Sequence, residues 1–284
     1  MFRAAFRSIG IERLRGDVRF AFRNLRQSAG FALTAVMTLG LGIGLSTAVF
    51  TVADALLLRP LPVRDQARIL VLSGETADGH FPDVPLNYRE AREFTRRTRV
   101  LQQVAFVTYE GAQPVPVVDR GRLFRLRRSV VSGNYFDLLG TRAIIGRTLN
   151  PSDDVVGAAP VAVLSYDGWR RAFGGDSSVI GRQLQSQLDG VSFTVVGVMP
   201  QGLEYPAATE YWAPLVPTRT VAKPDSVVAD VNLVGRLADR ATPGAARAEV
   251  TAYFRDLQTN GGPLGKLIIR GVANTLPRIV LGDT

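Results

Sequence analysis

The chain has 284 residues, 34 basic against 25 acidic side chains, a formal net charge of +9, one histidine and no cysteine. These counts exclude a disulfide framework and argue against a zinc site. They also do not indicate a nucleic-acid partner. Residues 1–28 alone carry +5, and the arginines of 59–284 alternate with acidic and apolar residues instead of forming one basic stripe.

Residues 1–28 predict a basic amphipathic helix at the cytoplasmic face of a membrane. Its apolar residues recur at spacings of mostly three or four between seven arginines. These apolar residues are Phe2, Phe6, Ile9, Leu14, Val18, Phe20, Phe22 and Leu25. A solvated, charged leader is the alternative.

The next segment predicts a transmembrane helix, which we place at 29–58. Gln27–Ala53 contains no charged residue, and about 20 helical residues already cross a hydrocarbon core about 30 Å thick. The preceding arginines place the N-terminus in the cytoplasm and 59–284 outside it. The alternative is a signal peptide that is cleaved near Ala53-Asp54-Ala55. The apolar region of a signal peptide, however, is typically only about half as long as the uncharged run found here. We therefore favour a retained anchor in contact with membrane lipid.

Small residues recur inside this segment. Gly40 and Gly44 match the small-xxx-small pattern by which membrane helices approach closely, and Ser46 and Ala48 extend the series. We expect these four residues to pack against neighbouring helices in the bilayer.

Residues 59–284 predict a mixed α/β domain, so the expected fold class is α+β. The expected strands are 68–73, 101–109, 123–132, 160–165, 182–188, 191–199 and 231–237, with a hairpin turn at Gly190. The expected helices are 85–98, 134–139, 166–173 and 243–259.

The sequence gives little support to an enzyme. A Ser-His-Asp triad would depend on the single His80, and Ser165 lacks the flanking glycines of a nucleophile elbow, so we expect Ser165 to cap a helix. Asp153 and Asp154 could bind a cation, but no calcium-loop spacing accompanies them. We expect no catalytic residue, no cofactor and no metal.

Several strings of the chain resemble MacB-like ABC transporter permeases. The first string is RFAFRNLRQSAGFALTAVMTLGLGIGLSTAVFTVADALLLRPLP, and others follow in the same order: VSGNYFDLLGTRAIIGRTLNPSDD, APVAVLSYDGWRRAFGGDSSVIGRQLQ, FTVVGVMPQGLEYP and LVGRLADRATPGAARAEV. The resemblance covers nearly the whole chain and is closest to orphan or duplicated permeases without a fused ATPase.

The resemblance implies a periplasmic core domain at 59–284 made of two subdomains, whose boundary the linear sequence leaves open and of which one could be inserted in the other. It implies a cytoplasmic ATPase partner, a second permease copy and a periplasmic adaptor. It also implies that the core domain couples ATP hydrolysis to movement outside the membrane (mechanotransmission), for export or efflux. Within the family strings we expect structural roles for nine residues: Tyr135, Phe136, Gly140, Gly146, Trp169, Phe173, Gly174, Gly197 and Pro200.

Two departures from the family pattern qualify this interpretation. The string Gly261–Leu267 lacks the Ser/Thr and glycine spacing of a Walker motif, so the chain is not expected to be its own ATPase. Ile268–Leu281 is too short and too charged to span, which predicts a permease fragment that lacks the last three membrane helices. The alternatives are a single-pass, membrane-anchored binding or scaffold module without transport activity and, less favoured, a secreted hydrolase.

Overall fold

The computed structural model describes residues 28–53, 62–108, 114–203, 205–206, 208–216, 230–259 and 269–276. The chain divides into two compact units, Met1–Arg59 and Pro60–Thr284, which are described separately below. The amphipathic helix expected at 1–28 lies almost wholly outside the described residues.

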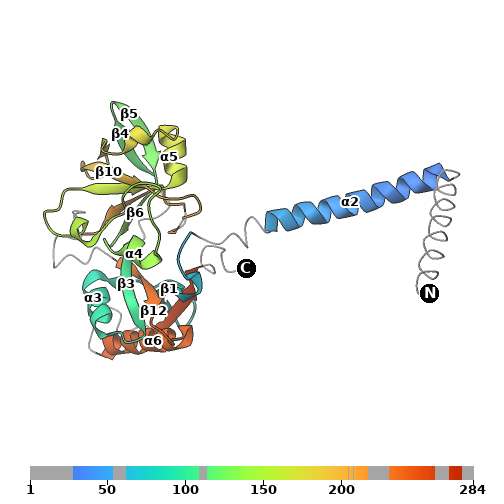
Figure 1. Cartoon of the computed structure of the whole chain (residues 1–284). Coiled ribbons are helices and arrows are strands. Elements are labelled where there is room, and N and C mark those ends of the chain that lie inside the picture. The colour runs from blue at the N-terminus through green and yellow to red at the C-terminus, as the bar shows by residue number, and fades with distance from the viewer. Residues whose placement is uncertain are drawn as a thin grey trace, which may run out of the picture. The chain divides into compact units, whose positions relative to one another are not determined.

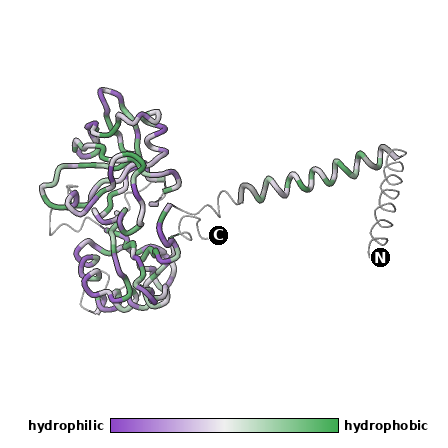
Figure 2. The backbone as a smooth tube through the Cα atoms, viewed as in Figure 1, coloured by the Kyte–Doolittle hydropathy of each residue, from purple (hydrophilic) through white to green (hydrophobic). Residues whose placement is uncertain are grey.

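The first unit contains one described helix, α2 (Ala29–Ala53). Figure 2 shows hydrophobic residues recurring along its length, and the large ones whose side chains are described are exposed, among them Phe31 at 76% and Leu41 at 74%. Within the described part of the chain, no helix meets the length and hydrophobicity that a membrane crossing requires. The span predicted from the sequence is therefore not confirmed and stays a prediction.

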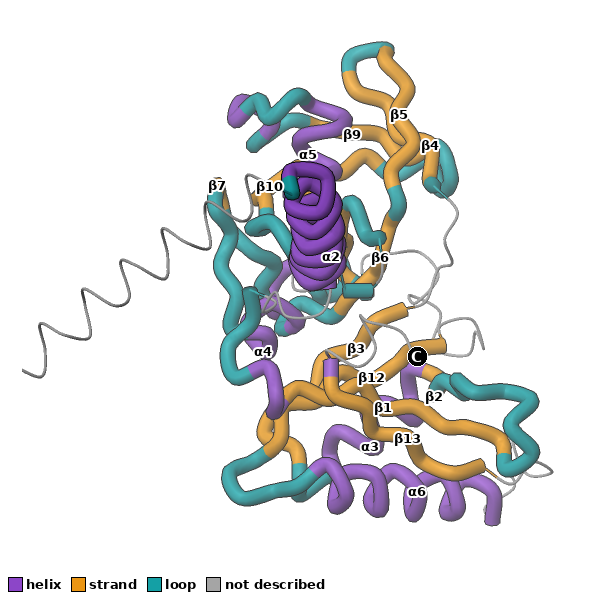
Figure 3. Tube along the Cα trace, turned by 90° about the vertical axis from the view of Figure 1, so that its right-hand side faces the viewer, coloured by secondary structure: helices purple, strands orange, loops and turns teal. Residues whose placement is uncertain are grey.

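The second unit is a mixed α/β domain (Figure 1) whose first lobe has a split βαβ arrangement. In chain order its elements are η2 (Gln66–Arg68), β1 (Ile69–Thr76), β2 (Leu86–Asn87), α3 (Tyr88–Arg97), β3 (Leu101–Thr108), β12 (Asp230–Leu237), α6 (Pro243–Thr259) and β13 (Ile269–Thr275). The four long strands lie in the order β13-β1-β12-β3, and each neighbouring pair is antiparallel. Figure 3 shows α3 and α6 along one face of these strands.

The second lobe lies in the sequence between β3 and β12. Its strands are β4 (Val115–Asp119), β5 (Arg122–Leu126), β6 (Arg128–Val131), β7 (Ile145–Gly146), β8 (Val161–Leu164), β9 (Gln183–Ser186), β10 (Ser192–Val198) and β11 (Tyr211–Pro214). Its helical elements are α4 (Tyr135–Leu139), η3 (Pro151–Asp153), α5 (Tyr166–Phe173) and η4 (Ser177–Val179). The strands continue the sheet of the first lobe in the order β6-β11-β8-β10-β9-β4-β5.

The two lobes share one sheet through a narrow joint. β3 and β6 pair at only two positions, Val107 with Val131 and Thr108 with Val130. Ser132 extends the contact, because its backbone N–H donates to the Phe106 carbonyl and its hydroxyl accepts from the Phe106 N–H, both at 2.9 Å. Few backbone hydrogen bonds thus hold the sheet together at this point.

The side chains of β1 point alternately to the two faces of the sheet and so contribute to two separate hydrophobic cores. Leu70 and Leu72 of β1 join the cluster beneath α3 and α6, whereas Ile69 and Val71 join a second cluster around α4. Successive side chains of a strand point to opposite faces, so β1 carries both cores. A third cluster fills the second lobe around Trp169 of α5.

Most elements expected from the sequence are present, with two differences in detail. Residues 123–132 form two strands, β5 and β6, rather than one, since β5 pairs with β4 whereas β6 pairs with β3 and β11. Pro85 precedes α3, which instead starts after Asn87, whose side chain forms a capping box with Glu90. The sequence does not predict the short strands β2, β4, β7 and β11, or β13 near the end of the described residues.

A glycine pair fixes the short β7–β10 contact and gives a stability prediction. A Cβ on Gly197 would lie 2.0 Å from the Arg147 carbonyl oxygen, so Gly197→Ala should lower the free energy of unfolding by about 2–3 kcal/mol. Gly244→Ala is the matched control, because its nearest neighbour lies 3.9 Å away and alanine favours the first turn of α6. Thermal and urea unfolding followed by circular dichroism measure both, and equal stability of the two variants would contradict the assignment.

Candidate functional site

The candidate site is a buried cluster, here called the central junction, in which both lobes of the second unit meet. It contains Ile69, Val71, Ala105, Val107, Val131, Tyr135, Phe136, Leu138, Leu139, Leu149, Val161, Val163, Met199, Leu203, Tyr205, Trp212, Val234 and Leu276. Val63, which lies before β1, packs against the cluster, and Leu276 directly follows β13. The cluster therefore contains residues of both lobes together with residues near the two ends of the described part of the second unit.

Aromatic side chains of α4 and β11 form the centre of the junction. The Tyr135 hydroxyl donates to the Tyr205 carbonyl at 2.7 Å, and the Trp212 indole N–H donates to the same oxygen at 3.3 Å. Phe136 meets Trp212 edge-on, with ring centroids 5.5 Å apart. Burial holds the pKa of Tyr135 well above its ordinary value, so the phenol keeps the proton that it donates.

Residues 62–68, here called the lead-in segment, are fastened to the end of α4. The Arg64 N–H donates to the Leu139 carbonyl at 2.8 Å, and the Thr141 hydroxyl donates to the Pro62 carbonyl. Gly140 ends α4 with φ of +68°, and a Cβ there would lie 2.6 Å from the Arg64 Cβ. Only glycine adopts this conformation without strain and leaves room for Arg64.

Arg236 of β12 completes this connection from inside the protein. Its guanidinium donates to the Leu138 carbonyl at 2.7 and 2.9 Å and to the Arg64 carbonyl at 2.9 Å, and the residue is 8% exposed. Burial lowers the pKa of Arg236, and Asp65 and Asp137 oppose the shift by attraction. One side chain thus joins the lead-in segment, α4 and β12.

Asp154 connects two segments of the second lobe that border the junction. Its carboxylate accepts from the Gly133 N–H at 2.9 Å, just before α4, and from the Val216 N–H at 2.6 Å, just after β11. Burial raises the pKa of Asp154, and these backbone donors oppose that shift. Six residues of the string VSGNYFDLLGTRAIIGRTLNPSDD belong to the junction: Val131, Tyr135, Phe136, Leu138, Leu139 and Leu149.

The remaining family-string residues lie in the second lobe. Trp169 donates from its indole N–H to the Asp176 carbonyl at 2.9 Å, and Phe173 packs against Phe124 with ring centroids 5.4 Å apart. Gly174 ends α5 with φ of +64°. These contacts are structural, which leaves the expected roles as predictions to be tested by mutation.

Gly146 and Gly197 are paired across β7 and β10, and a Cβ on Gly146 would lie 2.2 Å from the Val196 carbonyl oxygen. Pro200 follows β10 and lines a surface pocket of about 210 Å³ together with Arg127, Ser165 and Glu210. The Glu210 carboxylate in this pocket is held by Arg171 and by the Arg127 backbone N–H.

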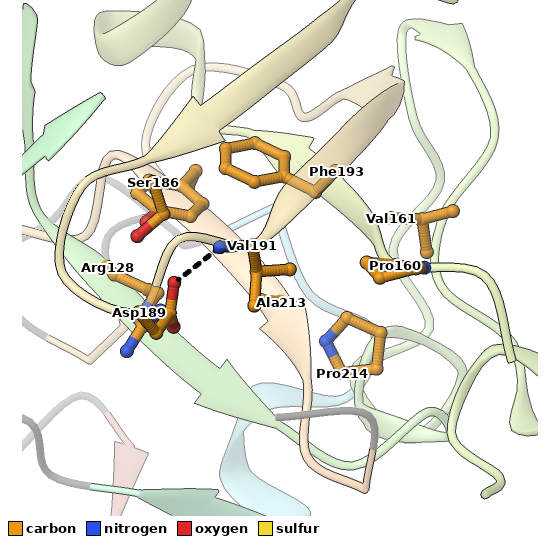
Figure 4. A pocket seen from close by; sticks show the side chains of 10 residues that line it. Arg128, Pro160, Val161, Ser186, Asp189, Val191, Phe193, Ala213 and Pro214 are labelled. Carbon is orange, nitrogen blue, oxygen red and sulfur yellow. Dashed lines mark hydrogen bonds and ion pairs between the residues drawn. The ribbon is translucent and has the colours of Figure 1, made fainter. Parts of the chain in front are cut away.

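The pocket in Figure 4 is narrow. It measures about 30 Å³, room for about one water molecule, between Pro160, Phe193 and Pro214. Arg128 and Asp189 close it with an ion pair of 2.6 Å, and Asp189 also accepts from the Val191 N–H at 3.2 Å.

The structure does not bring the considered enzyme residues together. His80 lies exposed before β2 in the first lobe, where its Nδ1 is 3.0 Å from Asp78. Ser165 lies in the second lobe and caps α5, as expected, by accepting from the Gly168 N–H at 3.0 Å. Asp153 is engaged by Arg147 at 2.6 Å, and no group of three His, Asp or Glu side chains suited to a metal occurs among the described residues.

Sequence reasoning missed Arg64, Tyr205, Arg236 and the linking role of Asp154. One signal was available for Arg236, because it is the one charged residue of the predicted strand Val231–Leu237 and lies between Gly235 and Leu237. Arg64 and Tyr205 contribute through backbone carbonyl groups, which residue identity does not reveal.

Comparisons with known proteins agree with this fold. The model of the family described as "MacB-like periplasmic core domain" matches residues 32–253. The periplasmic region of MacB from Actinobacillus actinomycetemcomitans is similar at 17% identity and a TM-score of 0.54, covering 73% of this chain and 89% of that chain. A domain of a putative permease protein from Porphyromonas gingivalis is similar at 14% identity and a TM-score of 0.53, covering 75% of this chain and 93% of that one.

The extracellular domain of YknZ, a noncanonic ABC-type transporter from Gram-positive bacteria, is similar at 14% identity and a TM-score of 0.53, covering 72% of this chain and 99% of that chain. No curated protein matches the chain. At these identities the structural likeness establishes the fold, and the family match covers well over half of the chain.

Loss of the Arg236 guanidinium should destabilise the junction. Arg236→Met removes the donors to two carbonyl groups and should lower the free energy of unfolding by about 3 kcal/mol. Amide exchange of 62–68 and 135–141 should rise with it. Arg255→Met, at an exposed position of α6, is the control and should leave both measurements unchanged.

Asp154 gives a prediction with a definite pH direction. A folded-state pKa above the ordinary 3.8 means that the folded protein binds the proton more tightly than the unfolded chain. The resulting contribution of Asp154 to the free energy of unfolding is fully present below a pH of about 3.8. It is lost as the pH rises through the folded-state pKa of Asp154. The unfolding free energy of the parent protein minus that of Asp154→Asn should therefore fall with rising pH, and a difference that rises instead would contradict the assignment.

Proposed function

Because the chain belongs to the MacB-like ABC permease family, we propose that it is the membrane-spanning permease component of a MacB-like transport system. ATP hydrolysis by a separate cytoplasmic subunit drives conformational change in the periplasmic core domain, and this movement serves export or efflux. The N-terminus lies in the cytoplasm and the core domain outside the inner membrane. A second permease copy and a periplasmic adaptor are the further partners that we propose.

The properties of α2 support an anchoring role in a bilayer. Its exposed leucine, isoleucine, valine, methionine and phenylalanine side chains would be costly to hydrate. The hydroxyls of Thr34, Thr38 and Thr47 donate to carbonyls four residues earlier in the same helix, at 2.7–3.1 Å. In the hydrocarbon core of a bilayer there is no water to bind polar groups, so each group must form its hydrogen bonds within the protein.

The small residues of α2 support packing against other helices, with one refinement. At 100° per residue, Gly40, Gly44 and Ala48 share one face, whereas Ser46 falls on the other side with Gly42. We therefore propose Gly40, Gly44 and Ala48 as the closest approach to a neighbouring helix, and Ser46 as part of a second contact.

The observation that carries the proposal is the position of the two ends of the core domain. Leu70 at the start of β1 pairs with Thr275 at the end of β13, so the chain enters and leaves the domain on adjacent strands. Both ends are also tied to the central junction, through Val63 and Leu276. A displacement applied at this end reaches both lobes without a ligand as intermediary.

Labelled cysteines can test the coupling, because the chain has no cysteine of its own. Cysteines at the exposed positions Ala248 and Leu188 place one spin label in each lobe. With the full chain purified together with its ATPase subunit from the membrane, the distance between the labels should shift by several ångström when the ATPase is trapped with nucleotide. A pair at Leu123 and Leu188, both in the second lobe, is the control and should not shift.

An unchanged distance between the lobes during ATP turnover would contradict mechanical coupling. Purification of the intact chain from the membrane without any ATPase would favour the binding or scaffold module instead.

A further inference from the structure

Three exposed arginines lie in or next to the lead-in segment, or next to residues bonded to it. Arg64 belongs to the segment, and Arg142 follows Thr141, whose hydroxyl is bonded to the Pro62 carbonyl. Arg240 follows Asp239, which is paired with Arg68 of the same segment at 2.8 Å. We name Arg64, Arg142 and Arg240 the base arginines.

The base arginines are not neutralised by neighbouring carboxylates. Arg64 is 79% exposed, and its only ion pair among the described residues is a loose one of 3.8 Å with Asp65. Arg142 and Arg240 make no ion pair with any described residue. Asp239 is engaged by Arg68, and buried Arg236 lies against the same segment.

Three carboxylates face this group: Asp65, Asp137 and Asp239. Five arginines lie in the same region: Arg64, Arg68, Arg142, Arg236 and Arg240. The surface therefore carries an excess of positive charge.

An apolar residue lies beside the basic ones. Ile144, two residues after Arg142, is 49% exposed. Exposed arginines and an exposed aliphatic side chain suit the boundary between lipid headgroups and acyl chains. There the apolar methylene stem of an arginine can contact acyl chains while its guanidinium contacts the headgroups.

Chain length places this surface within reach of a bilayer if α2 is inserted, so the inference rests on the proposed membrane anchoring. Eight residues, 54–61, separate α2 from the lead-in segment. Such a stretch covers at most about 30 Å when fully extended.

We propose that the base arginines bind the anionic headgroups of phospholipids in the bilayer that holds α2. The guanidinium groups donate to the headgroup phosphates, and they thereby fix the height and tilt of the core domain over the membrane. Because the lead-in segment is bonded to α4 and β12, this contact sets the resting position from which the domain moves.

The test compares the full chain in nanodiscs of phosphatidylcholine alone with nanodiscs that also contain phosphatidylglycerol. Amide exchange at 62–68, 141–145 and 238–241 should slow about fivefold or more with the anionic lipid, an effect of the size expected for one or more arginines at a charged surface. The triple variant Arg64→Gln, Arg142→Gln, Arg240→Gln should lose this difference. The triple lysine variant should keep most of it.

The matched control is Arg89→Gln, Arg125→Gln, Arg255→Gln, which removes three exposed arginines of α3, β5 and α6 and should behave as the parent chain. Equal exchange in both kinds of nanodisc, or an unchanged response of the base variant, would overturn the proposal. So would the same protection by inorganic phosphate in neutral nanodiscs, because the site would then be a free-anion site. Failure of the chain to enter any nanodisc would instead refute the membrane anchoring itself.

Discussion

The buried guanidinium of Arg236 is the constraint around which the second unit is arranged. Placing this charge inside the protein costs free energy that is recovered only if its donors find acceptors. It finds them in the carbonyls of Leu138 and Arg64, which belong to segments 98 and 172 residues away. The end of α4, the lead-in segment and β12 must therefore lie together, and the aromatic side chains of α4 are brought into the junction as a consequence.

The second lobe is inserted in the first lobe between β3 and β12. Leu70 of β1 pairs with Thr275 of β13, so the first and last described strands of the first lobe are neighbours. Two β3–β6 residue pairs, the hydrogen bonds of Ser132 and Arg236, and the packing of the central junction join the lobes. Because few backbone pairs cross the joint, we expect side-chain packing around Tyr135 and Trp212 to determine how firmly the lobes are held together. Under the proposed mechanical coupling, movement of the first and last strands and movement of the lobes would depend on these same buried contacts.

Local elements could be predicted from sequence because local chemistry specifies them. α5 has a serine cap and a glycine stop, and α6 has a helical pattern of apolar residues, and both bounds agree with the expectation. The break at Arg127 could not be foreseen, because it follows from β5 and β6 pairing with different neighbours. The junction depends on contacts between distant segments, several of them made by backbone carbonyls, and no spacing in the sequence encodes these.

The least exposed carboxylates among the described residues hold segments of the second lobe together. Each is bound to an arginine, as in Arg147–Asp153, Arg171–Glu210 and Arg182–Asp119. Asp153 also accepts from the Asn150 backbone N–H, and Glu210 accepts from the Arg127 backbone N–H. A carboxylate removed from water costs free energy unless it is paired and hydrogen-bonded in this way. We therefore count these pairs among the contacts that keep the second lobe in one shape, which is a condition of the mechanical role that we propose for the core domain.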